Sequence, residues 1–307
     1  MGTIADNGAI FERALRIEQR LERELSAPPF ALQNALIHAR TVLDVGCNCG
    51  VWTVAQARKH LYNEFIGIEE DAHLVQIARW HAQQRKTPNA QFACHPLRDI
   101  ETIGFPLGCF GYIQARFLAR GLLDLDYAAL ATSLFRLCKP GGVIAWTEFE
   151  LPITSSPAWQ SLCSLLCRAL DEIGQRYAPP TEIERLMAEL RARQGIAAPE
   201  RRHLCITPRL AYWLARAGFE QVQSIAHAID ISAYAPAHGE FVELAEAFFA
   251  QVRPLLMTTS LIQEAKLGKL IETARRELQD EHFCGLISGL TAWGKKPAMM
   301  NITTQNR

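Results

Sequence analysis

The feature that most constrains the fold is an alternation of short apolar stretches with longer amphipathic ones between residues 42 and 150. The short stretches carry the strand signal: VLDV, FIGIE, AQFAC, YIQA and GVIAWTEFE. Patterns typical of helices lie between them, such as AHLVQIARWHAQQ at 72–84 and YAALATSLFRLC at 127–138. This alternation predicts the α/β class, with a doubly wound parallel sheet and helices on both of its faces.

Composition excludes several classes of partner. Lys and Arg together number 32, as do Asp and Glu, so the formal charge is zero and no global field favours nucleic acid or an anionic membrane. We find neither a continuous apolar run of 18 residues nor a signal-peptide pattern, and we expect a cytoplasmic protein. The nine scattered cysteines indicate reduced thiols, and Cys47 and Cys49 lack two further ligands at matched spacing, so we expect no metal.

The texture of the chain changes after residue 151, where patterns typical of helices dominate. Ser156-Pro157 and Thr181-Glu182 are helix starts, and EQVQSIAHAIDIS and FCGLISGLTAW are two late strands. We therefore expect an N-terminal helical lid at 1–35 and a core at 36–150, followed by a helical cap insertion at 151–206. The core is expected to return at 207–235, followed by a second cap insertion at 236–282. A last core strand at 283–297 and a flexible tail at 298–307 are expected to follow.

The first strand ends in a glycine-containing turn, DVGCNCG. Asp44 interrupts the apolar run near its carboxyl end, where open α/β sheets bind ligands. Gly46 and Gly50 indicate a sharp turn that passes close to a neighbour, and Asn48 is the residue other than glycine that best tolerates a left-handed backbone. A dinucleotide fingerprint would need glycines at 46, 48 and 51, and positions 48 and 51 are Asn and Val, so a nicotinamide dehydrogenase is disfavoured.

Three further elements follow in order. Glu69 ends the second strand, with Glu70 beside it, and FACHPLRDI places His95, Pro96 and Leu97 after the third strand. The fourth strand leads into QARF at 114–117, and Lys139-Pro140-Gly141-Gly142 turns into the fifth strand.

With these four elements, the chain resembles the class I S-adenosylmethionine-dependent methyltransferases from about Arg40 to Glu150, and again at LARAGFEQV and the last strand. The resemblance implies a Rossmann-like sheet of seven strands, the last antiparallel, with a helical cap. It departs from the family pattern where Asn48 replaces the middle glycine, His95 replaces the usual Gly-Asp, and Gly111 replaces an Asp.

The resemblance also implies roles for individual residues toward S-adenosylmethionine. The loop from Gly46 to Gly50 would wrap the methionine half, Asp44 would orient its ammonium, and Glu69 would accept hydrogen bonds from both ribose hydroxyls. The full set of cofactor-binding residues is Asp44, Gly46, Cys47, Asn48, Gly50, Glu69, Glu70, His95, Pro96, Leu97, Gln114 and Arg13.

The expected reaction is methyl transfer to O, N or C of a small apolar metabolite, by in-line displacement, with S-adenosylhomocysteine as product. An enzyme of the same fold that catalyses a rearrangement or cyclisation, or a non-catalytic cofactor-binding protein, is the alternative. Glu148 and His238 are the candidate bases, and Arg116, Phe117, Trp146 and Tyr234 are the candidate substrate contacts. We expect a role in secondary metabolism, in a monomer or homodimer with a small-molecule substrate.

Overall fold

The computed structural model describes residues 19, 28–121, 126–174, 182–194 and 203–298. These residues form two compact units. Unit 1 holds the described residues up to Glu148, Leu210–His227 and those from Leu290 onward, and unit 2 holds Phe149–Arg209 and Ala228–Gly289. The helical lid expected at 1–35 and the tail expected at 298–307 lie largely outside the described residues.

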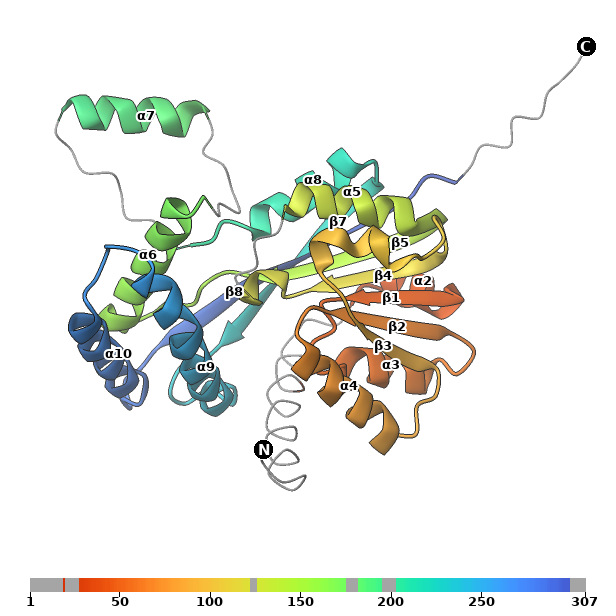
Figure 1. The fold of residues 1–307 in the computed structure, drawn as a ribbon, viewed down its shortest axis with the longest axis horizontal. Coiled ribbons are helices and arrows are strands. Elements are labelled where there is room, and N and C mark those ends of the chain that lie inside the picture. Colours follow the sequence, from red (N-terminus) through yellow and green to blue (C-terminus); the bar gives the residue numbers. More distant parts are fainter. Residues whose placement is uncertain (1–18, 20–27, 122–125, 175–181, 195–202, 299–307) are drawn as a thin grey trace, which may run out of the picture. The chain divides into compact units, whose positions relative to one another are not determined.

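The first part of the chain follows the alternation expected from the sequence (Figure 1). The strands are β1 (Thr41–Val45), β2 (Glu64–Glu69), β3 (Ala90–Cys94), β4 (Phe110–Arg116) and β5 (Cys138–Phe149). The helices are α2 (Phe30–His38), α3 (Val51–Lys59), α4 (Ala72–Gln84), η1 (Leu97–Ile103), η2 (Leu118–Gly121) and α5 (Tyr127–Leu137).

The second part is mostly helical, with two long strands, as expected. Its strands are β6 (Ile153–Thr154), β7 (Glu220–Asp230) and β8 (Gly285–Lys295). Its helices are α6 (Pro157–Glu172), α7 (Glu182–Arg193), η3 (Thr207–Arg209), α8 (Leu210–Ala217), α9 (His238–Met257) and α10 (Glu264–Leu278). Within the described residues, no helix is long and apolar enough to cross a membrane.

The sheet has the strand order β3-β2-β1-β4-β5-β8-β6, and β7 also pairs with β8 (Figure 1). The pairs among β1 to β5 are parallel. β8 is antiparallel to β5, because Lys296 N donates to Gly142 O while Glu150 N donates to Ser288 O. The Rossmann-like order and the antiparallel last strand are therefore confirmed, and the two-residue β6 adds an edge strand to the seven expected.

Helices cover both faces of the sheet in unit 1. Helices α2, α3 and α4 contribute Leu36, Val54 and Ala78 to a core that includes Phe65 of β2 and Tyr112 of β4. On the opposite face, Tyr127 of α5 and Trp213 of α8 stack with Trp146 of β5, at centroid distances of 5.9 Å, 5.2 Å and 6.2 Å within the trio. These two layers hold the carboxyl ends of β1, β2 and β4 in place.

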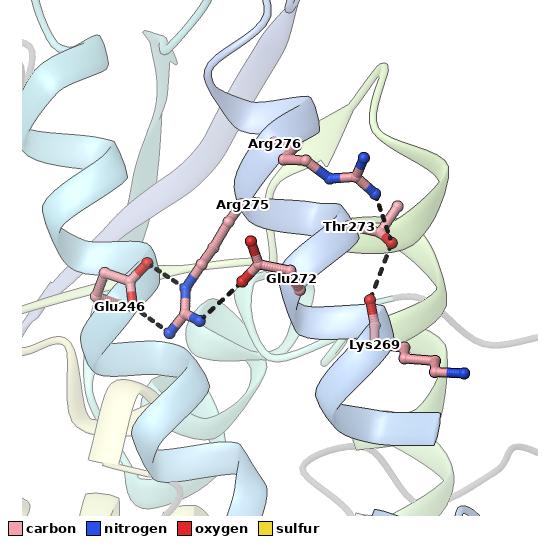
Figure 2. A network of polar contacts seen from close by, with 6 residues as sticks. All are labelled: Glu246, Lys269, Glu272, Thr273, Arg275 and Arg276. Atoms are coloured by element: carbon pink, nitrogen blue, oxygen red, sulfur yellow. Dashed lines mark hydrogen bonds and ion pairs between the residues drawn. The ribbon is translucent and has the colours of Figure 1, made fainter. Parts of the chain in front are cut away.

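Unit 2 has its own apolar core and a surface network between two helices. Trp159 of α6 packs against Phe241, Phe248 and Phe249 of α9. Figure 2 shows Arg275 of α10 donating to both carboxylate oxygens of Glu246 on α9, at 2.8 Å and 2.7 Å, and to Glu272 on its own helix. Because this pair is about half exposed, its contribution to stability is modest, on the order of 0.5–1 kcal/mol.

Candidate functional site

The loop after β1 runs from Gly46 to Gly50 and is named the cofactor loop for its predicted role. Gly46, Asn48 and Gly50 all have left-handed backbones, with φ of 69°, 48° and 70°. The Asn48 amide donates to the Gly46 carbonyl oxygen at 2.8 Å and so closes the turn with its own side chain. This is the tolerance that the sequence predicts for asparagine at this place.

The cofactor loop has no room for a side chain at its first residue. A Cβ built on Gly46 would lie 2.3 Å from Leu118 Cδ2 and 3.0 Å from the Arg116 carbonyl oxygen. The last residue of β4 and the Leu118 side chain therefore lie directly against the loop. Gly46 is required both for its backbone conformation and for this close approach.

Glu69 lies where the cofactor loop meets the end of β2. Its Oε2 accepts a hydrogen bond from Asn48 N at 3.1 Å, and its Oε1 accepts from the amides of Glu70 and Asp71 at 2.8 Å and 3.3 Å. The side chain is buried. Three backbone donors thus fix the Glu69 side chain at the carboxyl edge of the sheet, beside the loop.

The turn after β3 is tied to the end of β2. Glu70 accepts from Leu97 N at 2.5 Å, and His95 N donates to the Glu69 carbonyl oxygen at 3.0 Å. Leu97 is buried, and His95 Nε2 lies 3.0 Å from both Asp99 O and Thr102 Oγ1 of η1. The structure thereby brings Glu69, Glu70, His95, Pro96 and Leu97 together, as the sequence predicts.

Asp44 and Arg116 form a buried ion pair behind the loop. Arg116 Nη2 lies 3.7 Å from Asp44 Oδ2, which also accepts from Thr53 Oγ1 of α3 at 2.5 Å. The Arg116 guanidinium lies 5.4 Å from the ring centroids of both Trp52 and Phe117. Arg116, a candidate substrate contact, thus has an internal anion, Asp44, as a partner, and its contact with a substrate stays a prediction.

Gln114 lies two residues before Arg116 on β4. Its Oε1 accepts from the Tyr112 hydroxyl at 3.1 Å, and both side chains are buried. Burial, and then the Asp44 charge, raise the pKa of Tyr112, so its hydroxyl stays protonated and donates. Because alternate residues of a strand lie on one face, Gln114 faces the same side of β4 as Arg116.

Glu148, a candidate base, and Trp146, a candidate substrate contact, are both buried. Glu148 is fully buried and accepts from Leu118 N at 2.9 Å, Ala119 N at 3.2 Å and Trp146 Nε1 at 2.9 Å. Trp146 is also fully buried, within its stack with Tyr127 and Trp213, so it lies in the core and not on an exposed platform. The contacts of Glu148 with Leu118 and Ala119 could not be predicted from the sequence, because these residues are distant from it in the chain.

Two other candidates belong to unit 2, and one lies outside the described residues. His238 begins α9, with Nδ1 3.0 Å from the Ile231 carbonyl oxygen, and Tyr234 is largely exposed. Arg13 lies outside the described residues, so its contact with the cofactor stays a prediction.

Sequence reasoning missed Thr53 and Leu118. Thr53 is the third residue of α3 and orients Asp44, and a hydroxyl in the first turn after a glycine loop was the available signal. Leu118 closes over Gly46 from a segment that carries no motif, so only the tertiary contact reveals it.

Comparison with known proteins gives a match over the core. The profile of a family described as "Methyltransferase domain" matches residues 42–142, while a search of curated proteins gave no match. Similar solved structures include the YcgJ protein of Bacillus subtilis, with 15% identity over 84% of this chain and 92% of that chain and a TM-score of 0.49.

Two further solved structures are similar at lower TM-scores. A phosphoethanolamine N-methyltransferase of Haemonchus contortus, in complex with phosphomonomethylethanolamine and S-adenosylhomocysteine, is 14% identical over 92% of this chain and 52% of that chain, with a TM-score of 0.44. The [4+2]-cyclase SpnF is 18% identical over 84% of this chain and 74% of that chain, also with a TM-score of 0.44. Identities this low carry no substrate assignment.

The matched segment, residues 42–142, spans the cofactor loop, Glu69, the turn after β3 and β4. These are the elements on which the resemblance stated from the sequence depends. Residues 42–142 are therefore similar to a methyltransferase domain.

Proposed function

We propose that this protein transfers the methyl group of S-adenosylmethionine to an O, N or C atom of a small apolar molecule. The observation that carries the proposal is the placement of the Glu69 carboxylate 3.1 Å from the backbone amide nitrogen of Asn48 in the cofactor loop. A carboxylate that accepts hydrogen bonds suits the two hydroxyls of a ribose. The left-handed glycine turn beside it suits the compact, charged amino-acid end of the same ligand.

The residues present fit that cofactor. The backbone of Gly46 and Gly50, at φ of 69° and 70°, gives a turn that a ligand can approach closely. Gly50 is the N-cap of α3, and the first amides of an α-helix have no partner within the helix. Glu69 would hold the ribose hydroxyls, and the turn at 95–97 would hold the adenine. S-adenosylmethionine supplies a methyl group that its sulfonium makes electrophilic, and no metal is needed for this.

The protein's own contribution to such a reaction is mainly geometric. It must hold the nucleophile about 3 Å from the methyl carbon, in line with the departing sulfur, and exclude water. Gln114 of β4 and Phe117, the residue after β4, would lie beside the sulfonium. If the acceptor arrives protonated, a base is needed, and the proposal retains His238 for that role, because Glu148 is engaged by backbone amides.

The proposed substrate class rests on the extent of unit 2. The helices α6, α7, α9 and α10 are additions that the α/β core does not need, and such helical insertions suit an enclosed small molecule better than an open macromolecular surface. Cytoplasmic location, a role in secondary metabolism and a monomeric or homodimeric state belong to the same proposal.

Calorimetric titration of the purified protein with S-adenosylhomocysteine tests the cofactor. Glu69→Ala should weaken binding at least about tenfold, because a charge-assisted hydrogen-bond acceptor is lost. Glu64→Ala is the matched control, since Glu64 is an exposed carboxylate at the other end of β2. Equal affinity for Glu69→Ala and the wild type would contradict the proposal.

Incubation of metabolite extracts with isotope-labelled S-adenosylmethionine tests the reaction. A product heavier by one methylene, and carrying the label, is expected. Turnover without a gain in mass would show the alternative, a rearrangement or cyclisation on the same fold.

A further inference from the structure

The Glu148 carboxylate connects the end of β5 to the backbone that follows β4. Among the described contacts, its two oxygens accept hydrogen bonds from the amides of Leu118 and Ala119 and from the indole of Trp146. The side chain has no exposed surface. A buried carboxylate with this many charge-assisted bonds fixes its partners firmly, since breaking one leaves a buried group unsatisfied.

The backbone that Glu148 holds is strained. Phe117 has φ of 56°, a left-handed conformation that is unfavourable for a bulky residue. Such a conformation persists only where the surroundings enforce it. Here the Phe117 amide donates to the Thr147 carbonyl oxygen at 2.9 Å, and the next two amides donate to Glu148.

The strained turn is in close contact with the cofactor loop. Leu118, whose amide Glu148 holds, lies so close to Gly46 that a Cβ there would be 2.3 Å from Leu118 Cδ2. The Arg116 carbonyl oxygen lies against the same position. A continuous chain of contacts thus runs from Glu148 through Leu118 to the first residue of the cofactor loop.

We propose that Glu148 is a positioning residue that holds residues 117–119 against Gly46 and thereby sets the shape of the cofactor loop. This rests on the proposed function, because it assigns Glu148 to the same site. It differs from the role of a general base, since a base would act on the acceptor and leave the binding of S-adenosylhomocysteine unchanged.

Glu148→Gln tests the proposal. The amide keeps the size of the side chain but replaces one acceptor oxygen by a donor, which then faces a backbone N–H of Leu118 or Ala119. We expect the dissociation constant for S-adenosylhomocysteine, measured by calorimetry, to rise about tenfold.

Glu150→Gln is the matched control. Glu150 also accepts three hydrogen bonds, from Cys205 N, Thr207 N and Thr207 Oγ1, but these partners belong to unit 2 and not to the turn after β4. Both variants lose a comparable set of bonds, so both should lower the melting temperature. Only Glu148→Gln should weaken the binding of S-adenosylhomocysteine, with Glu150→Gln staying within about twofold of the wild type.

Leu118→Ala gives a second test if Glu148→Gln does not fold. It removes the side chain against Gly46 and keeps the amide that Glu148 binds, and we again expect weaker binding of S-adenosylhomocysteine. Unchanged affinity in a folded Glu148→Gln or Leu118→Ala protein would overturn the positioning role, even where stability falls. Absence of binding by the wild type would instead refute the proposed function itself.

Discussion

At the scale of single residues, the sequence predicts what depends on local backbone chemistry. Gly46, Asn48 and Gly50 adopt the left-handed backbones expected from their types, and Glu69 lies at the end of β2 beside them. The partners of Arg116 and Glu148 could not be predicted. Arg116 pairs with Asp44 and Glu148 with the Leu118 amide, and both partners are far away in the chain. Contacts between residues that are distant in the chain cannot be predicted from the pattern of a single sequence.

Gly46→Ala should be more damaging than a substitution at another left-handed glycine. The alanine would incur backbone strain of about 1–2 kcal/mol and an overlap with Leu118 that adds roughly 1–3 kcal/mol. Urea denaturation should show the loss of stability, and calorimetry with S-adenosylhomocysteine should show weaker binding.

Gly141→Ala is the control for backbone strain alone. Gly141 has φ of 76°, and no atom lies within 4 Å of a Cβ built there. We expect a loss of about 1 kcal/mol and unchanged binding. Equal effects of the two substitutions would show that the contact with Leu118 is unimportant.

At the scale of helices and strands, apolar periodicity predicts the elements, and pairing over long range decides the rest. β1 to β5 and α4 lie where the patterns place them, and Ser156 caps α6 as its type predicts. β6 was missed because two residues carry no periodicity, and it exists only through its pairing with Leu286 and Gly285 of β8.

Ser156→Ala should destabilise the junction of α6 and α10. Ser156 Oγ accepts from Trp159 N at 3.0 Å and donates to Glu277 Oε2 at 2.6 Å, and Glu277 also accepts from Ala158 N. We expect a loss of about 1–2 kcal/mol in the free energy of unfolding, measured in urea. Ser161→Ala, on the same helix but exposed, should change it by less than about 0.5 kcal/mol, and similar losses for both would contradict the capping role.

A buried polar chain links three neighbouring strands and should make stability depend on pH. His227 of β7 lies 2.7 Å from the Thr291 hydroxyl of β8, which lies 2.7 Å from the Thr147 hydroxyl of β5. Burial lowers the pKa of His227 in the folded state, so the neutral ring is favoured there. As pH falls through the ordinary histidine pKa, about 6.5, the unfolded state takes up the proton first and folding stability is lost.

His227→Gln should reduce this loss of stability on acidification. Urea midpoints measured from pH 7.5 down to pH 5 should fall less for the variant than for the wild type. Part of the pH dependence should remain, because burial also lowers the pKa of His81. His282→Gln, at an exposed position, serves as the control, and a slope equal to the wild type in His227→Gln would exclude His227 as the source.

At the scale of the whole molecule, the division into units does not follow the division into sequence segments. β5, β7 and β8 each begin in one unit and end in the other, since the boundaries fall at Glu148, His227 and Leu290. Sequence texture marks where helices replace alternation, near residue 151, but it cannot show that long strands continue through such a boundary. Because these strands continue along the chain from one unit into the other, we expect the two units to unfold together.

Unfolding should therefore be one cooperative transition, and a ligand of unit 1 should stabilise unit 2 as well. S-adenosylhomocysteine at 100 times its dissociation constant should raise the free energy of unfolding by about 2.7 kcal/mol. Hydrogen exchange in urea, followed by mass spectrometry, can report on peptides of β1 and β2 in unit 1 and of α9 and α10 in unit 2. We expect both sets to shift by the same amount on addition of the ligand. Glu69→Ala, which is expected to bind weakly, should show no shift in either set. A shift confined to unit 1 would mean that the shared strands do not couple the two units.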